Sequence, residues 1–159
     1  MPDQRPLILA TSIVPGRDVE LHRATVKSWR AAGCEVISVN GAAETASLRS
    51  DFPDLTIVTA PATAERFAHK PVPYIHDLLK ALRNACAARN ACAAHNVSPA
   101  QCTVGIINAD IYFRDVPNLA ATLHREAQGA LVLGPRVDVD ASASFTSFYP
   151  SGNETYSVG

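Results

Sequence analysis

Hydrophobic and polar positions follow one another in blocks along the chain, and the blocks predict strands and helices in turn. Apolar runs bounded by Pro, Gly or Asn predict five strands, at 7–14, 35–40, 55–60, from Thr103 through Asp110, and at 130–137. Longer segments between them predict helices, from Asp18 to Gly33, over 43–50, from Val72 onward, and from Pro117 to Gly129. The alternation of strand and helix indicates an α/β fold: a Rossmann-like three-layer sandwich with a mainly parallel sheet and helices on both faces.

The helix that begins near Val72 has the clearest periodicity in the chain. Its apolar residues are spaced three and four apart, as a helix that packs on a sheet requires. The predicted core-facing residues are Ile75, Leu78, Leu79, Leu82 and Cys86. The segment before this helix, from Ala62 to Val72, has no period.

The fourth predicted strand is notable because it runs directly into two polar residues, Asn108 and Asp110. Side chains two apart on a strand point the same way, so this strand would present an amide and a carboxylate together. Ligands of α/β sheets bind at the carboxyl ends of strands, and hard divalent cations prefer oxygen ligands. The pair therefore predicts a ligand site, and the structural alternative is an Asx-rich turn that closes a buried strand.

Composition narrows the possible partners. The 159 residues are 47% hydrophobic and 18% charged with a net charge of -1, which predicts a single domain over 1–159 with a sizeable core. Lys and Arg form no run, which argues against nucleic acid or an anionic membrane as the partner. Short apolar runs and an N-terminus unlike a signal peptide predict a cytoplasmic protein without a transmembrane segment. The four cysteines lack zinc-ligand spacing, so we expect small hydrophobes instead.

Several well-known nucleotide and hydrolase motifs are missing. The first strand is not followed by Gly-x-Gly-x-x-Gly, and the chain has no P-loop and no Gly-x-Ser-x-Gly. These absences argue against a dinucleotide-dependent dehydrogenase, a P-loop nucleotide hydrolase and an α/β-hydrolase.

The order of elements, together with the segment VGIINADIYF, resembles the GT-A nucleotide-sugar glycosyltransferases, including the family 2-like enzymes. In this resemblance Asn108-Ala109-Asp110 occupies the place of the family's Asp-x-Asp motif. The resemblance implies an enzyme that transfers a sugar from a nucleoside diphosphate sugar to an acceptor, with Mn²⁺ or Mg²⁺ on the diphosphate. The donor, the acceptor and the catalytic residues stay unknown, and a nucleotidyltransferase on a similar sheet is a weaker enzyme alternative.

The resemblance also implies roles for individual residues. Asp110 would hold the metal against the diphosphate, and Asn108 would contact the ribose or the metal's water shell. Asn in place of an acid removes one negative charge, which weakens the case for a required metal. The remaining implied nucleotide-sugar contacts are Thr11, Ser12 and Ile13 in the second half of the first strand, Asn40 at the end of the second, and Lys70 before the long helix. His69, Tyr74, His76 and Asp77 are interpreted as residues of a helix start and are not assigned to the site.

Two alternatives stay open. Asp138-Val-Asp140 is a literal Asp-x-Asp at the end of the fifth predicted strand, but its place in the element order favours Asn108 and Asp110. The resemblance also places an acceptor surface and a catalytic base beyond Gly159, so we expect this chain to lack that C-terminal part. A non-catalytic nucleotide-binding or interaction domain on the same fold is therefore the second functional hypothesis.

Overall fold

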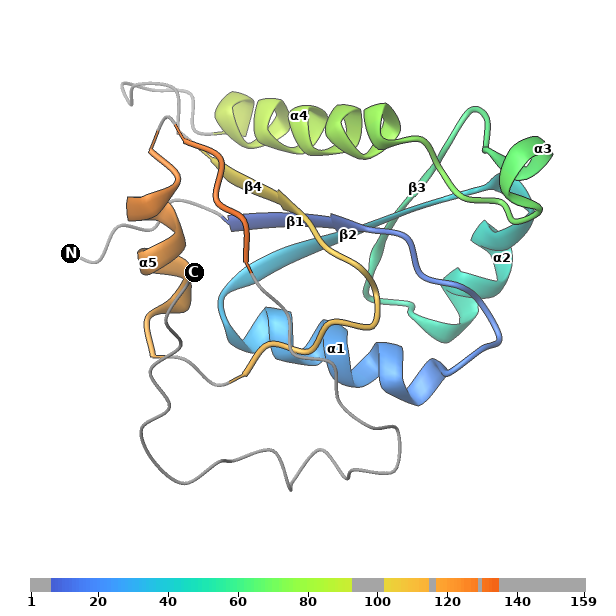
Figure 1. The fold of residues 1–159 in the computed structure, drawn as a ribbon, viewed down its shortest axis with the longest axis horizontal. Helices are drawn as coiled ribbons and strands as arrows, with labels where there is room; N and C mark the ends of the chain where they lie inside the picture. Colours follow the sequence, from blue (N-terminus) through green and yellow to red (C-terminus); the bar gives the residue numbers. More distant parts are fainter. Residues whose placement is uncertain (1–6, 93–101, 115–116, 129, 135–159) are drawn as a thin grey trace, which may run out of the picture.

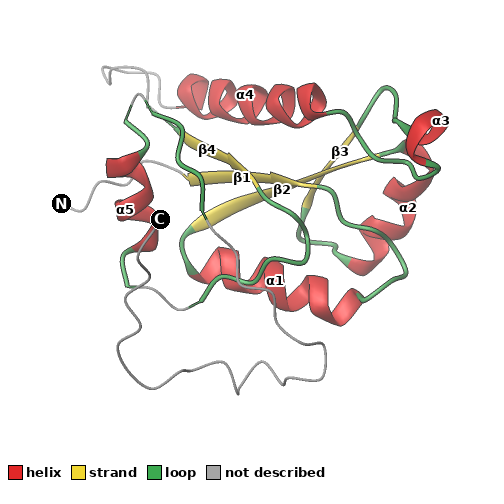
Figure 2. Cartoon of the chain, viewed as in Figure 1, coloured by secondary structure: helices red, strands yellow, loops and turns green. Residues whose placement is uncertain are grey.

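The structure, a computed structural model, describes residues 7–92, 102–114, 117–128 and 130–134, with only the backbone for 90–92. It is an α/β fold in which strands and helices alternate (Figures 1 and 2). The strands are β1 (Leu7–Thr11), β2 (Cys34–Asn40), β3 (Thr56–Thr59) and β4 (Thr103–Ile106). The helices are α1 (Val19–Ala31), α2 (Ala42–Asp51), α3 (Glu65–Ala68), α4 (Ile75–Cys92) and α5 (Leu119–Glu126).

The four strands form one parallel sheet in the order β3-β2-β1-β4. All five residues of β1 are buried, because this strand pairs on both sides and is covered on both faces. The chain builds outward from β1 through β2 to β3 and then returns to place β4 on the other side of β1. The strand order therefore reverses between β1 and β4.

The reversal places helices on both faces of the sheet (Figure 1). Alternate β1 residues, Leu7 and Leu9, pack in one core cluster with Trp29 of α1 and Leu48 of α2. The intervening residues, Ile8 and Ala10, pack in a second cluster with Leu78, Ala81 and Leu82 of α4. The predicted fold class, a parallel sheet with helices on both faces, is thus confirmed.

Most predicted elements are present with shifted ends. Helix α1 begins directly after Asp18, whose φ of 48° is left-handed and whose side chain makes no capping hydrogen bond. The helix ends before Gly33, whose φ of 84° suits glycine. The segment from Ala62 to Val72, which showed no period, contains the short helix α3, and Pro117 precedes α5 instead of lying in its first turn.

Three predictions about α4 are wrong. The helix begins at Ile75 because the residues before it are held extended, with Thr63 bridged to Pro73. Ile75 and Leu79 are 70% and 51% exposed, whereas Leu78 and Leu82 are buried. Leu78, Ala81 and Leu82 face the sheet, whereas Leu79 lies at the side of this stripe and Ile75 is the first residue of the helix.

The end of the sheet also differs from the prediction. β4 stops at Ile106, and residues 130–134 are described without a strand, while 135–137 lie outside the described residues. Helix α5 packs on the same face as α1 through Ala120 and Leu123. A parallel strand added outside β4 from that face would make a left-handed crossover, which is rare. This handedness accounts for the missing fifth strand over 130–134.

β4 lies at the edge of the described sheet and has glycine at its centre, where Leu9 of β1 comes close. A Cβ on Gly105 would lie 2.9 Å from the Leu9 Cδ2 atom on the neighbouring strand. Val104 and Ile106 pair with Ile8 and Ala10 and so lie on the α4 side of the sheet, where they are 44% and 47% exposed. None of the described helices is long and apolar enough to cross a membrane.

The corrected face of α4 can be tested with a matched pair of leucine substitutions. Leu82→Ala should lower the free energy of unfolding by about 2–5 kcal/mol, because the side chain is 1% exposed and its removal leaves a cavity. Leu79→Ala should cost much less, because half of that side chain is already exposed. Urea denaturation of both variants measures the difference, and equal losses would contradict the orientation of α4.

Candidate functional site

The point where the strand order reverses, between β1 and β4, is the place where open α/β sheets bind ligands. The Ile107 amide donates to the Ala10 carbonyl at 3.0 Å and extends the β1–β4 ladder one residue beyond β4. Residues 107–113, here called the exit segment, therefore leave the sheet directly beside the end of β1. The residues after β1 and the exit segment border the same edge (Figure 1).

Asn40 fixes the carboxyl ends of β1 and β2 relative to each other. Its Nδ2 donates to the Ile13 carbonyl at 2.8 Å and to the Glu44 carboxylate of α2 at 3.0 Å, with Ser12 Oγ more distant at 3.4 Å. Its Oδ1 accepts from the Ser38 hydroxyl at 2.6 Å, and that hydroxyl also accepts from the Ile13 amide. One buried amide thus joins two strands and a helix.

This network limits which of the residues near the ends of β1 and β2 have side chains free to contact a ligand. Thr11, Ile13 and Asn40 are all fully buried, and the Asn40 amide is occupied by the protein itself. Ser12 is half-buried and is the side chain of this group with access to solvent. The ligand contacts predicted for these residues stay predictions, and the buried members serve here as the frame of the site.

Asn108 and Asp110 lie at this edge but on a turn instead of a strand. The Ile111 amide donates to the Asn108 carbonyl at 3.2 Å and closes a turn over 108–111. The turn forms because β4 ends at Ile106 and the chain must leave the sheet toward α1. The turn is the structural alternative stated above, an Asx-containing turn after the strand. Both side chains are also exposed, so the same residues present the predicted polar pair.

Helix α1 holds the exit segment through three buried side chains. The Thr25 hydroxyl donates to the Ala109 carbonyl at 2.8 Å, and the Trp29 indole donates to the Ile111 carbonyl at 2.8 Å. The Ser28 hydroxyl accepts from the amide of Phe113 at 3.0 Å. These three hydrogen bonds are called the α1 tether below. The tether was not predicted, because helical periodicity shows which residues are buried but not which distant backbone they meet.

His22 of α1 is a titratable residue that the Asp110 carboxylate affects. It is 7% exposed on α1, and burial lowers its pKa, while the carboxylates of Asp18 and Asp110 act in the opposite direction. Its Nδ1 has no hydrogen-bond partner among the described residues. The spacing of His22, Val26 and Trp29 along one helical stripe is the sequence signal that could have identified it.

The residues around the start of α4 divide into exposed and buried groups. Lys70 is exposed in the connection between α3 and α4, and no contact in the described residues joins it to Asn108 or Asp110. Asp77, interpreted from sequence as an ordinary helix-start residue, is 5% exposed, with one carboxylate oxygen 3.1 Å from His76 Nε2. The His76 ring stacks on Tyr74.

The rival pair, Asp138 and Asp140, lies outside the described residues.

The donors fit a metal ion that arrives with its ligand better than a resident one. The described residues contain no cluster of three or more His, Cys, Asp or Glu side chains that could hold an ion. Mg²⁺, however, is often held by one or two carboxylates together with waters and the phosphates of the substrate. Asp110 with Asn108 supplies one carboxylate and one amide oxygen, which suits that second pattern.

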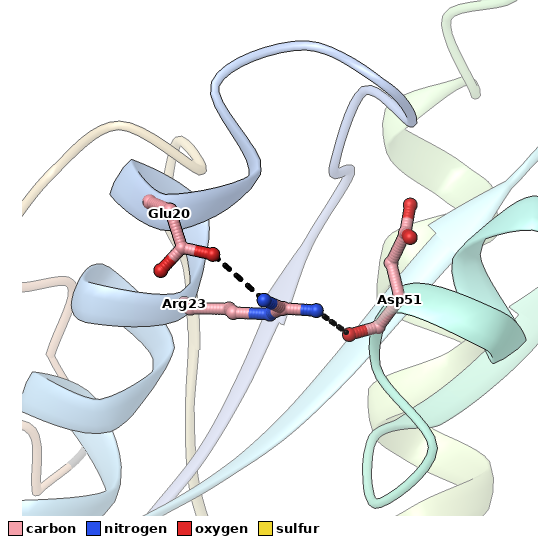
Figure 3. A network of polar contacts seen from close by, with 3 residues as sticks. All are labelled: Glu20, Arg23 and Asp51. Atoms are coloured by element: carbon pink, nitrogen blue, oxygen red, sulfur yellow. Dashed lines mark hydrogen bonds and ion pairs between the residues drawn. The ribbon is translucent and has the colours of Figure 1, made fainter.

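A hollow elsewhere on the surface has a structural explanation. It lies between α1 and the segment after α2 and is lined by residues that include Arg23, Arg30 and Phe52. Arg23 binds the Glu20 carboxylate at 2.7 Å and the Asp51 carbonyl at 3.1 Å (Figure 3). Arg30 donates to the Asp54 carbonyl at 2.7 Å. Arg23 thus joins α1 to the end of α2, and Arg30 joins α1 to the α2–β3 connection.

The cysteines are consistent with their predicted role as small hydrophobes. Cys34, Cys86 and Cys102 are free, and Cys34 is buried in the core between the sheet and α1. Burial raises the pKa of Cys34 to about 11, so this thiol is protonated and unreactive at neutral pH.

Comparisons of this chain with family models, with curated proteins and with solved structures found no match.

The Asn40 network predicts a large loss of stability from one small change. Asn40→Ala should lower the free energy of unfolding by roughly 1–3 kcal/mol, because the buried Ile13 carbonyl and Ser38 hydroxyl lose their partner. Asn108→Ala is the control and should change it by less than about 0.5 kcal/mol, because that side chain is exposed. Chemical denaturation measures the free energy of unfolding of both variants. A similar loss in both would show that the Asn40 hydrogen bonds do not hold β1, β2 and α2 together.

The closeness of Asp110 to His22 predicts a shift that does not depend on any ligand. Because the Asp110 carboxylate raises the pKa of His22 against the effect of burial, Asp110→Asn should lower that pKa further. An NMR titration of the His22 ring measures the shift. Asp54→Asn, beside the opposite edge strand β3, should leave the His22 pKa unchanged. An unchanged His22 pKa in Asp110→Asn would show that Asp110 does not lie close enough to affect His22.

Proposed function

We propose that this chain binds a nucleoside diphosphate sugar at the carboxyl ends of β1 and β4 and acts as a GT-A type glycosyltransferase. The observation that carries the proposal is that two segments leave the paired strands β1 and β4 at the point where the strand order reverses: the residues after β1, which include Ser12, and the exit segment, which carries Asn108 and Asp110. Such points bind nucleotides in other α/β sheets. The neighbouring backbone is fixed by Asn40 and by the α1 tether, which supports a preformed site.

The exposed polar side chains suit different parts of such a ligand. Asp110 provides the negative charge that a divalent cation on the diphosphate needs, and Asn108 provides an amide that can bind a ribose hydroxyl or a metal-bound water. A bound Mn²⁺ or Mg²⁺ would neutralise charge that develops on the leaving diphosphate. Ser12, half-buried after β1, has a hydroxyl that can donate to the nucleoside.

The transfer of a sugar needs more than donor binding. The acceptor hydroxyl must lose a proton as it attacks the anomeric carbon, while the bond to the diphosphate breaks. In this proposal Asp110 acts on the leaving side of that reaction, and the residue that takes the acceptor proton is not assigned. The proposal therefore covers the donor site and leaves the acceptor open.

A second function, a non-catalytic nucleotide-binding or interaction domain, is favoured by two observations. The described residues offer one carboxylate and one neutral amide at the site, with no larger cluster for an ion. The β4 edge also exposes Val104 and Ile106, an apolar surface of the kind that binds other polypeptides. Binding of nucleotide without turnover of any nucleotide sugar would favour this second function.

Substitution of Asp110 tests the proposed function. We expect uridine diphosphate or another nucleoside diphosphate to bind the protein and raise its Tm in the presence of Mn²⁺, since a ligand of the native state stabilises it. Asp110→Ala should abolish the metal-dependent part of binding and leave the fold intact, because the side chain is exposed. Asn108→Ala should weaken binding by about 0.5–1.5 kcal/mol, the contribution of one hydrogen bond.

Isothermal calorimetry across a nucleotide panel, with Mn²⁺ and with EDTA, makes the measurement. Asp54→Ala removes an exposed carboxylate from the opposite edge of the sheet and should leave binding unchanged. Asp138→Ala and Asp140→Ala should likewise have little effect. Loss of binding at Asp138 or Asp140 with retention at Asp110 would assign the site to the rival pair.

A further inference from the structure

The α1 tether is unusual because it concentrates polar side chains on the buried face of a helix. Thr25 and Trp29 are 0% exposed and Ser28 is 8% exposed. Hydroxyl groups on a buried helix face cost free energy unless they find partners, and Thr and Ser are not favoured inside helices. The Thr25 and Ser28 hydroxyls also lie within hydrogen-bond distance of carbonyls in their own helix, those of His22 at 2.9 Å and Thr25 at 2.7 Å. Their bonds to the exit segment are formed in addition to these contacts.

The partners of the tether lie at alternate positions of the exit segment. The carbonyl of Ala109, the carbonyl of Ile111 and the amide of Phe113 are bound in turn. The side chains of Ala109 and Phe113 pack against the core, and the Phe113 ring meets the Trp29 ring edge-on at 6.4 Å. Positions 109, 111 and 113 are therefore fixed to α1.

Because positions 109, 111 and 113 are fixed to α1, the side chains at the even-numbered positions point away from α1. Burial alternates along the segment, so that the side chains at 108, 110 and 112 are exposed. A slip of the segment by one residue would bury Asp110 against α1 and expose Ala109. The three hydrogen bonds to specific backbone atoms oppose such a slip.

We propose that Thr25, Ser28 and Trp29 are positioning residues, whose hydrogen bonds to the exit segment hold Asn108 and Asp110 in the orientation that binds the ligand. This inference rests on the proposed function for the identity of the ligand. The restraint on the exit segment is a separate physical claim that can be measured without any nucleotide. The two claims can therefore fail independently.

The tether is tested by removing one hydroxyl without changing the shape of the side chain. Thr25→Val keeps the volume and removes the donor to Ala109, and Thr25→Ser restores the hydroxyl. The matched control is Thr45→Val in α2, because the Thr45 hydroxyl is also buried on a helix and bonds a carbonyl, that of Gly41, at 3.1 Å. Thr45 has no contact with the exit segment in the described residues.

Two measurements are made on each variant: amide hydrogen exchange across 107–113, and calorimetric binding of uridine diphosphate with Mn²⁺. Thr25→Val should speed exchange in the exit segment and weaken binding about two- to tenfold, which is the loss of one hydrogen bond. Thr25→Ser should recover both. Thr45→Val should lower the Tm without changing either. Trp29→Phe, which keeps a ring in the core and loses the donor to Ile111, should behave as Thr25→Val does.

Faster exchange in Thr25→Val with unchanged nucleotide affinity would overturn the positioning role. Unchanged exchange in both Thr25→Val and Trp29→Phe would overturn the tether itself. If wild-type protein binds no nucleoside diphosphate, the proposed function and the positioning role both fall, while the exchange experiment still decides whether α1 restrains the exit segment.

Discussion

The parallel pairing of β1 with β4 is the interaction on which the rest of the candidate site depends. Three strands could have continued outward from β1 in one direction, and the sheet would then have had no reversal and no shared edge at β1. Because the chain returns across the α4 face, β4 lies beside β1, and the ladder ends with the bond between Ile107 and Ala10. Gly105 lets this pairing form without moving Leu9, since a Cβ at position 105 would lie 2.9 Å from the Leu9 Cδ2 atom.

Two sets of buried hydrogen bonds then fix the chain on either side of that edge. On the β1 side, Asn40 holds Ile13 and Glu44, and on the β4 side the α1 tether holds the exit segment. Both sets place polar side chains in the core, where each is stabilising only while its partners are present. The exposed residues that border the edge, Asn108 and Asp110, contribute little to packing. The frame and the candidate ligand contacts are thus provided by different residues.

The sequence predicted the fold class well, because apolar runs and helical spacing follow from burial, and burial dominates in β1, β2 and α1. It predicted the ends of α1 from Asp18 and Gly33, but other element ends less well: β1 stops at Thr11 and not at Val14, and α4 begins at Ile75 and not near Val72. The face of α4 was misassigned because Ile75 and Leu79 are apolar yet exposed, and periodicity alone does not separate them from Leu78. The predicted fifth strand is absent over 130–134, where a parallel strand beside β4 would need a left-handed connection through α5. No local sequence pattern shows the handedness of a connection.

The site residues show a similar division. Asn108 and Asp110 were predicted from their position after an apolar run, and the segment that carries them leaves the sheet beside the end of β1; their contact with a ligand stays a prediction. The ligand contact at Asn40 was implied by the resemblance, and the buried Asn40 amide bonds other groups of the protein. His22 and Thr25 were not found, because their importance depends on contacts with residues more than 80 positions away in the chain.

The central claim, that the ligand site lies at the edge between β1 and β4, is tested most directly by paramagnetic broadening in NMR spectra. Mn²⁺ added with uridine diphosphate broadens the signals of amides close to the bound ion. The account predicts broadening at Ser12 and over 108–111, with the signals of Asp54 and Leu55 at the opposite edge unchanged. Broadening centred on any other part of the chain, or none at all, would contradict it.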